Sequence, residues 1–243
     1  DFGLSDISIW ESWYGVKHAA AKLIDSAVYG LPEVNREAIA TASLVACPGC
    51  YPTAVQLGFL PLLEAGLIDP ESLVASCASG TSGAGRSAKV NLLLSESVET
   101  MKSYGVGGHR HLPEMEQGLI RMAGTNVSLT FVPHLAPMVR GIHATLFATL
   151  TETAVDLQAV FKARFCNEPF IRLTEGNYEP ETRHVRGTNM CEIDVTHPPG
   201  DRVVVTVAID NLVKGAAGQD IQAMTIMLGV DEAAGLSAPA VGP

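Results

Sequence analysis

CPGCYPT, at residues 47–53, is the most informative stretch of the chain, because it places a cysteine thiol where an apolar helix begins after a short buried strand. Residues 43–46 are predicted to form the strand and residues 51–66 the helix, with Pro52 in the first turn, where proline is tolerated. A thiol at such a junction faces unpaired backbone N–H groups and the positive end of the helix dipole. Both stabilise a thiolate, so we expect Cys50 to have a pKa lowered from about 8.5 toward neutrality and to act as a nucleophile.

The same C-x-x-C spacing has other interpretations. It is typical of a thioredoxin-like dithiol and of half of a zinc site. A thioredoxin domain would not carry the glycine-rich and histidine-rich segments that follow here, and a zinc site needs a second pair of ligands. The remaining cysteines, Cys77, Cys166 and Cys191, are scattered singly. The motif alone therefore favours a nucleophile, with a redox pair or a buried structural cysteine as the alternatives.

Composition limits the classes of function. The chain has 243 residues, enough for one large domain or two small ones, and its formal net charge of −10 argues against a nucleic-acid partner. Five cysteines, an odd number in a long chain, fit a reducing, cytoplasmic compartment better than a disulfide framework. No apolar run reaches the length of about 18 residues that a membrane span needs, and no signal peptide is visible. Because the chain begins at Asp1 without Met, we expect a processed or truncated piece.

Hydrophobic patterning predicts an α+β or α/β body with a mixed sheet. Residues 142–150 alternate apolar and polar side chains, as in a strand of a sheet covered on at least one face. The other predicted elements are strands at 73–79, 127–132 and 203–209 and helices at 113–123, 154–165 and 214–228. Residues 1–42 are expected to form loops and short helices with aromatic anchors, and the tail from Ala233 is expected to fray.

A histidine-rich segment, YGVGGHRHLPE at residues 104–114, precedes one of the predicted helices. Histidine titrates near neutral pH, so His111 is a candidate acid/base for an activated thiol. Glu114, three residues further on, could orient its imidazole as a carboxylate orients a catalytic base. A capping or surface histidine is the structural alternative. Metal ligation by His109 and His111 is disfavoured, because no matching acidic cluster accompanies them.

Three further segments are candidates for binding an anion. The loop SGTSGAGR, residues 79–86, has small residues that let backbone N–H groups approach a phosphate, and Arg86 adds charge. It matches neither a P-loop nor a G-x-G-x-x-G turn, so a plain glycine-rich turn explains it equally well. Residues 211–219 form a strand-to-helix junction with an exposed helix start, and Arg140 supplies another possible anion contact.

Together these segments resemble the N-acetyl-γ-glutamyl-phosphate reductase family, which belongs with the aspartate-semialdehyde dehydrogenase group. The matching runs occur in the family's order at residues 27–36, 48–53, 79–86, 108–114, 131–141 and 211–222. The resemblance implies a mixed-sheet catalytic and dimerisation domain, of the glyceraldehyde-3-phosphate dehydrogenase-like C-terminal type, at residues 50–211. It implies that residues 1–49 are the remnant of a Rossmann NADP-binding domain. Residues 212–243 would be a C-terminal helix that returns to that remnant, with a frayed tail.

The resemblance also implies an activity and a set of site residues. The activity is NADPH-dependent reduction of an acyl phosphate to a semialdehyde through a cysteine thioester, by a homodimer or homotetramer without a metal. Cys50 would be the nucleophile, His111 the acid/base and Glu114 its catalytic partner. The residues implied to bind the substrate are Arg110, His109, Arg86, Arg140 and Tyr104. Those implied to bind NADPH are Ser82, Gly83, Ala84, Gly85, Asn211 and Lys214.

The chain departs from the family's pattern in three respects. It has no Rossmann G-x-G-x-x-G turn after a strand, and about a hundred residues of the cofactor domain are expected to be absent before Asp1. The family usually has Asn where Cys47 stands, and Asp-Phe-Arg where this chain has Asp1-Phe2-Gly3. We therefore expect weak NADPH binding. The alternatives are a related reductase of an aminoadipyl or carrier-linked acyl phosphate, and an inactive or redox module built on Cys47 and Cys50.

Overall fold

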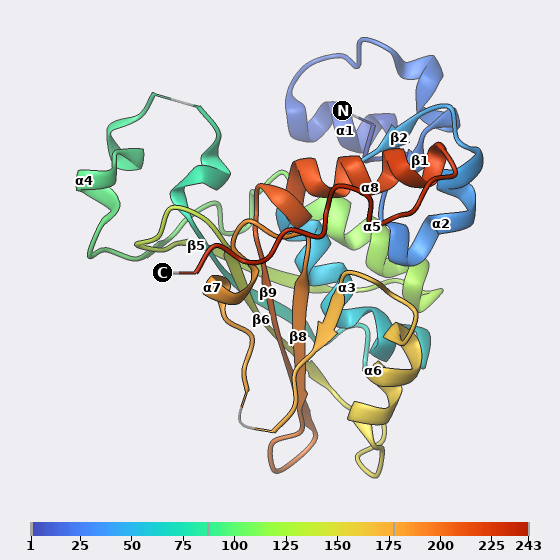
Figure 1. Ribbon diagram of the computed structural model, residues 1–243, viewed down its shortest axis with the longest axis vertical. Coiled ribbons are helices and arrows are strands. Elements are labelled where there is room, and N and C mark those ends of the chain that lie inside the picture. Colours follow the sequence, from blue (N-terminus) through green and yellow to red (C-terminus); the bar gives the residue numbers. More distant parts are fainter. Residues whose placement is uncertain (1, 87, 177, 243) are drawn as a thin grey trace.

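A seven-stranded mixed sheet forms the centre of the computed structural model, which describes residues 2–86, 88–176 and 178–242 (Figure 1). Its strand order is β4-β5-β3-β6-β9-β8-β7. The strands are β3 (Leu73–Ser79), β4 (Lys102–Ser103), β5 (Leu129–Leu135), β6 (Ile142–Thr149), β7 (Ile171–Leu173), β8 (Cys191–Thr196) and β9 (Arg202–Ile209). β3 runs parallel to β5 and β7 to β8, whereas the other neighbours are antiparallel. The predicted mixed-sheet α+β fold is confirmed.

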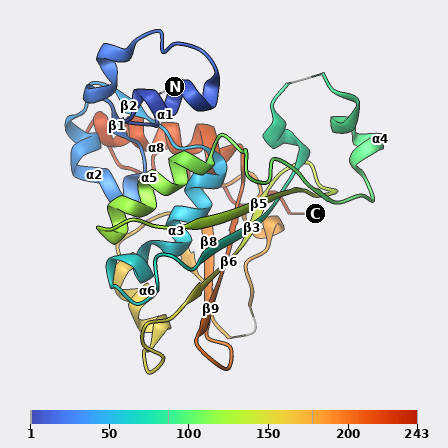
Figure 2. The ribbon, with the colours of Figure 1, turned by 180° about the vertical axis from the view of Figure 1, so that it is seen from behind.

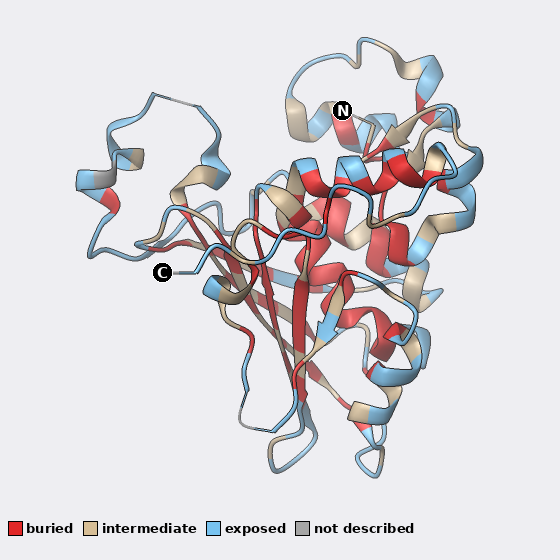
Figure 3. Ribbon diagram, in the orientation of Figure 1, coloured by how far each residue is buried: buried red, intermediate tan, exposed pale blue. Residues whose placement is uncertain are grey.

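Three helices cover one face of this sheet: α3 (Cys50–Glu64), α5 (Leu112–Ala123) and α6 (Leu157–Phe165) (Figures 1 and 2). Residues 51–63 of α3 are all buried, as expected for a helix that is apolar on every side (Figure 3). A Cβ on Gly58 would lie 2.4 Å from a methyl group of Leu146, so α3 packs closely on β6. The sheet thereby positions the helix that begins with Cys50.

A second, smaller unit lies beyond the amino end of α3 (Figure 1). It contains the parallel strands β1 (Val28–Tyr29) and β2 (Val45–Ala46), which are joined by α2 (Pro32–Thr41). The last helix, α8 (Gly218–Met227), packs against α2 through a small core of Ile39, Ala223 and Ile226. The chain after β9 therefore returns to the segment that precedes Cys50.

Shorter helices connect these parts. They are α1 (Ile7–Tyr14), η1 (Ala21–Ser26), η2 (Thr81–Ala84), η3 (Val90–Leu92), α4 (Leu94–Ser97), α7 (Thr182–Val185) and the π-helical turn η4 (Val213–Ala217). η3 and α4 belong to a lobe that projects away from the sheet edge (Figure 1). None of the helices in the described part of the chain is long and apolar enough to cross a membrane.

Several boundaries differ from the sequence-based predictions. The strand at 73–79 is correct, whereas the helix predicted at 154–165 begins only after Asp156, whose carboxylate caps it by accepting from the N–H of Ala159 at 3.0 Å. The helix predicted at 214–228 is interrupted, because Ala216 has non-helical backbone angles. Strands β7 and β8 were not predicted. Near the end of the tail, the Val241 N–H donates to the carbonyl of Arg186 at 2.9 Å. Asp1, named in the sequence comparison, lies outside the described residues.

Candidate active site

Cys50 is the first residue of α3, reached from β2 through an extended Gly49. The backbone N–H groups of Cys50 and Tyr51 interact with the thiol and favour its ionised form, as the sequence predicts for a helix start. Burial has the larger effect and raises the pKa of Cys50 to about 11. The predicted lowering of this pKa is therefore wrong, because the desolvation of a thiolate outweighs two peptide donors.

His111 lies directly against the residue before the cysteine. A Cβ on Gly49 would be 2.5 Å from the His111 Nε2, so only glycine leaves room for the imidazole. Burial, followed by the neighbouring His109 and Arg110, lowers the pKa of His111 to about 3. The Nδ1 atom of His111 is buried and has no hydrogen-bond partner among the described residues. The structure thus brings a neutral imidazole to the turn that carries Cys50.

Glu114 does not orient His111, contrary to the sequence-based expectation. Its Oε1 accepts hydrogen bonds from the Tyr29 hydroxyl at 2.8 Å and from the Gly49 N–H at 3.0 Å. Gln56 connects Tyr29 and Glu114, since its Nε2 donates to the Tyr29 hydroxyl oxygen at 3.1 Å and to the Glu114 backbone carbonyl at 3.2 Å. Burial raises the pKa of Glu114 to about 7 against the opposing effect of these two donors. Glu114 therefore fixes the peptide before Cys50.

Tyr29 and Gln56 were missed as site residues. Tyr29 occurs in one of the runs that carry the family resemblance, but nothing in its local sequence points to residues 56 and 114. The three side chains meet only because α5 packs against α3, and Gly118 makes this approach possible. A Cβ there would lie 2.4 Å from the Gln56 Nε2.

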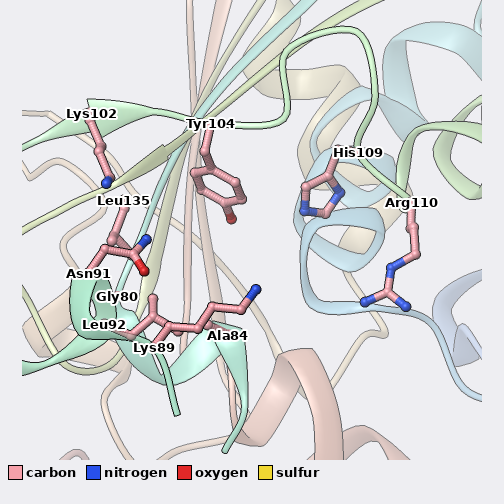
Figure 4. Close-up of a pocket in the computed structure, with 11 residues that line it drawn as sticks. Gly80, Ala84, Lys89, Asn91, Leu92, Lys102, Tyr104, His109, Arg110 and Leu135 are labelled. Atoms are coloured by element: carbon pink, nitrogen blue, oxygen red, sulfur yellow. The ribbon is translucent and has the colours of Figure 1, made fainter. Parts of the chain in front are cut away.

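A cavity of about 340 Å³ lies next to this turn (Figure 4). Three of the predicted substrate-binding residues, Tyr104, His109 and Arg110, line it. The hydroxyls of Tyr104 and Tyr51 are 2.8 Å apart, and the His109 ring packs edge-on against the His111 ring. Burial lowers the pKa of His109 to about 4. The lining residues that sequence reasoning missed are Lys89, Asn91, Leu92, Lys102 and Leu135.

The other two predicted anion-binding arginines lie apart from this cavity. Arg140 forms an ion pair with the buried Asp210 at 2.9 Å and lines a different cleft. Arg86 is exposed and is not among the described residues that line the cavity. The sequence could not separate these arginines from Arg110, because their positions depend on how the loops fold over the sheet.

The residues predicted to bind NADPH divide into two groups. Gly83 and Ala84, in the small-residue loop 82–85, line the cavity, where their backbone is accessible to a bound group. Asn211 is buried and fixes this loop instead, since its Nδ2 donates to the Ser82 Oγ at 3.0 Å and its Oδ1 accepts from the Gly141 N–H at 2.7 Å. Asn211 therefore holds the loop in place at the edge of the cavity.

Lys214 does not fit a cofactor-binding role. Its side chain is fully buried, and its ammonium group donates to the Glu33 Oε1 at 2.6 Å and to the Gln222 Oε1 at 2.9 Å. Its charge is therefore neutralised inside the protein and is not offered to a phosphate. The following residue, Gly215, lies so close to Cys50 that a Cβ would be 2.7 Å from the cysteine Cβ. Lys214 thus anchors the segment that packs on the cysteine.

The other interpretations of the cysteine pair find no support in the geometry. Cys47 and Cys50 are free thiols, and burial, followed by a hydrogen bond with the carboxylate of Asp220, raises the pKa of Cys47 to about 12. No group of three or more His, Cys, Asp or Glu residues in the described part of the chain is arranged to hold a metal ion.

Comparisons with known proteins show which family the chain resembles. The family model described as "Semialdehyde dehydrogenase, dimerisation domain" matches residues 50–211. The N-acetyl-gamma-glutamyl-phosphate reductase of Pseudomonas fluorescens (strain Pf0-1) is 60% identical over 238 residues, which are 98% of this chain and 69% of that protein. The reductase of the same name from Ectopseudomonas mendocina (strain ymp) is 60% identical over 244 residues, covering 100% of this chain and 71% of that protein.

A similar fold occurs in aspartate semialdehyde dehydrogenase II from Vibrio cholerae, solved in complex with ASA. That structure matches with a TM-score of 0.69 at 17% identity, over 93% of this chain and 76% of that one. At this identity the likeness concerns the fold. The similarity to the reductases, by contrast, extends over nearly the whole sequence at 60% identity. The chain therefore belongs to the semialdehyde dehydrogenase family, among the N-acetyl-gamma-glutamyl-phosphate reductases.

Proposed function

We propose that the chain reduces N-acetyl-γ-glutamyl phosphate to the corresponding semialdehyde, with release of phosphate and with NADPH as the reductant. The observation that carries this proposal is the Cys50 turn packed against His111, in a chain 60% identical to proteins named for that reaction. The description of the matched family model supports a homodimer or homotetramer as the working assembly. The single, scattered cysteines support a cytoplasmic location.

The first step is attack of the Cys50 sulfur on the acyl carbon. His111, neutral at pH 7 because its pKa is low, accepts the thiol proton as the sulfur bonds to carbon. The bond between the acyl carbon and the phosphate oxygen then breaks, phosphate leaves, and a thioester on Cys50 remains. The N–H groups of Cys50 and Tyr51 stabilise the sulfur whenever it carries negative charge.

The second step converts the thioester to an aldehyde. When bound along residues 82–85, the nicotinamide cofactor supplies the hydride that this step requires. His111, protonated in the first step, gives its proton to the oxygen as the thiohemiacetal forms. It takes the proton back from this hydroxyl as the carbon–sulfur bond breaks and the aldehyde forms, and then returns it to the departing Cys50 thiolate. Glu114 keeps the Gly49 peptide fixed against the imidazole throughout. Both steps therefore use one histidine and one rigid turn.

The test is acylation of the thiol in the absence of cofactor. The chain is incubated with acetyl phosphate, released phosphate is measured, and the acylated residue is located by peptide mass spectrometry. We expect acylation of Cys50 in the parent chain and in Cys47→Asn, and none in Cys50→Ser. His111→Gln is expected to slow acylation by about 10²- to 10⁴-fold, which is the usual contribution of a general base.

Two results would contradict the proposal. Equal acylation of Cys47 and Cys50, or loss of reactivity in Cys47→Asn, would favour the dithiol interpretation. The cofactor is examined separately, by titrating the chain with NADPH and NADH and following nicotinamide fluorescence. We expect weak binding, because Lys214 is already paired with Glu33 inside the protein. The family resemblance implies a preference for NADPH.

A further inference from the structure

The cavity beside the Cys50 turn is strongly cationic, although the chain as a whole is acidic. Three cations, Lys89, Lys102 and Arg110, are among its lining residues, and none of the described lining residues is a carboxylate. The complete chain contains 26 acidic and 16 basic residues. A concave site lined by one sign of charge raises the local concentration of ligands of the opposite sign. This local charge reversal points to an anionic ligand.

The three cations are available to such a ligand. Figure 4 shows Lys89 extending across the cavity toward the space between Tyr104 and Arg110, while Lys102 lies on the side of Leu135. None of the three forms an ion pair with a described carboxylate, and Arg110 instead lies over the Tyr14 ring at 5.5 Å. Their charges are therefore not neutralised within the described part of the protein.

The cavity adjoins the reacting centre through shared aromatic walls. Tyr104 is hydrogen-bonded to Tyr51, the residue that follows Cys50, with 2.8 Å between the two hydroxyl oxygens. The His109 ring has its centroid 4.9 Å from that of His111. A ligand held by the lysines therefore lies next to the turn that carries the thiol.

We propose that Lys89 and Lys102 determine substrate specificity, by binding together with Arg110 the phosphoryl and carboxylate groups of an N-acylated acyl phosphate. This inference rests on the proposed function and names its binding residues. At neutral pH the phosphoryl group carries close to two negative charges and the carboxylate one, which matches the three cations. Lysine ammonium and arginine guanidinium groups are the usual partners of both anions.

The absence of a carboxylate among the described lining residues adds a second element of selectivity. A substrate with a free α-ammonium group would meet three like charges and find no acidic partner for its own charge. N-acylation removes that charge. The cavity therefore selects N-acylated substrates over the corresponding free amino acids, through repulsion as well as attraction.

The first test compares two alkylating reagents that differ in charge. Iodoacetate is an anion and iodoacetamide is neutral, and both modify Cys50 in the same position. We expect the ratio of their rate constants at Cys50 to fall about fivefold in Lys89→Ala and in Lys102→Ala, the loss expected for one partly exposed charge interaction. Lys89→Arg, which keeps the positive charge, should give the same ratio as the parent chain. Lys22→Ala, the same change at an exposed residue outside the cavity, should leave it unaltered.

The rate at which iodoacetamide alkylates Cys50 separates a failure of the lysine assignment from a failure of the proposed function. A Cys50 that reacts normally with iodoacetamide, but shows an unchanged ratio in both lysine variants, overturns the lysine assignment alone. A Cys50 inert to both reagents counts against the thiol chemistry. In that case binding of N-acetylglutamate, measured by calorimetry, decides the present proposal. We expect it to bind more tightly than glutamate and about fivefold more weakly to each alanine variant.

A further experiment determines whether the two lysines bind the phosphoryl group of the substrate or a phosphate group of the cofactor. Protection of Cys50 from iodoacetamide is measured with phosphonoacetate, which carries a phosphonate and a carboxylate and cannot acylate the thiol, and with 2′,5′-ADP, which carries the phosphates of the NADP adenosine half. Protection by phosphonoacetate should require Lys89 and Lys102, whereas protection by 2′,5′-ADP should not. If only the 2′,5′-ADP protection is lost in the variants, the lysines serve the cofactor and the proposal is wrong.

Discussion

Glu114 is a buried carboxyl group whose ionisation is linked to folding. Its pKa is raised to about 7 from the ordinary value of 4.5, so the folded state retains the proton longer than the unfolded chain does. The contribution of this group to the free energy of unfolding is therefore greatest below pH 4.5 and is lost as the pH rises through 7. A shift of this size corresponds to about 3 kcal/mol.

The variant Glu114→Gln tests this linkage. The amide oxygen can still accept from Gly49 and Tyr29, but the side chain no longer ionises. We expect the free energy of unfolding of the variant to decline less than that of the parent between pH 5.5 and 8.5, by an amount on the order of 2 kcal/mol. Urea unfolding at several pH values measures the difference. The same change at the exposed Glu37 serves as the control, and parallel pH profiles for parent and Glu114→Gln would refute the argument.

At the scale of elements, the site depends on the close approach of α3 and α5. Gly118 of α5 faces the fully buried Gln56 of α3, whose amide donates to both Tyr29 and Glu114. An added methyl group at Gly118 cannot be accommodated unless Gln56 moves and loses these hydrogen bonds. The packing of two helices therefore controls the position of the Gly49 peptide, which belongs to neither helix.

We expect Gly118→Ala to destabilise the protein, although alanine is the better helix former by about 1 kcal/mol. Overpacking and the lost hydrogen bonds should outweigh this gain and leave a net cost of about 1–3 kcal/mol. Thermal unfolding measures the change, and Cys50 alkylation reports whether the turn has shifted. Gly108→Ala, where an added Cβ meets no atom within 4 Å, is the control. Increased stability in Gly118→Ala would show that Gln56 relaxes freely.

At the scale of the whole molecule, a buried ion pair joins the two ends of the chain. Lys214 and Glu33 are separated by 181 residues, and the side chain of each is almost completely inaccessible to solvent. Gln222, in the middle of α8, accepts a second hydrogen bond from the lysine. This pair holds α2 against the segment that packs on Cys50.

Breaking this pair should be costly. Lys214→Met leaves the Glu33 carboxylate buried without its partner, and we expect a loss of about 3–5 kcal/mol in the free energy of unfolding. The double variant Lys214→Met with Glu33→Leu should recover most of that loss, because no buried charge then remains. Lys22→Met is the exposed control. A single variant as stable as the parent would mean that Glu33 reaches solvent or becomes protonated without cost.

Local patterns allowed much of the fold to be predicted. The alternation in β6 and the apolar run of β3 identified strands correctly, because side-chain period and burial are read from neighbouring residues. β8 was missed although it lies inside the sheet, since its buried Glu192 interrupts the apolar pattern. That glutamate is held by an ion pair with Arg172 at 3.0 Å, a contact that no local pattern reveals.

The amino-acid sequence was enough to place a cysteine at the start of an apolar helix and a histidine segment before another helix, and to identify a family from the order of the motifs along the chain. The first two features depend on residues only a few positions apart, and the third depends on order alone and needs no three-dimensional contact. The tertiary structure alone decided that Glu114 holds Gly49, 65 residues away, and that Lys214 is neutralised by Glu33. It also decided that Lys89 and Lys102 line one cavity and that burial raises the pKa of Cys50. Which groups a side chain pairs with, and how far it is removed from water, depend on packing between distant segments. No short stretch of sequence contains that information.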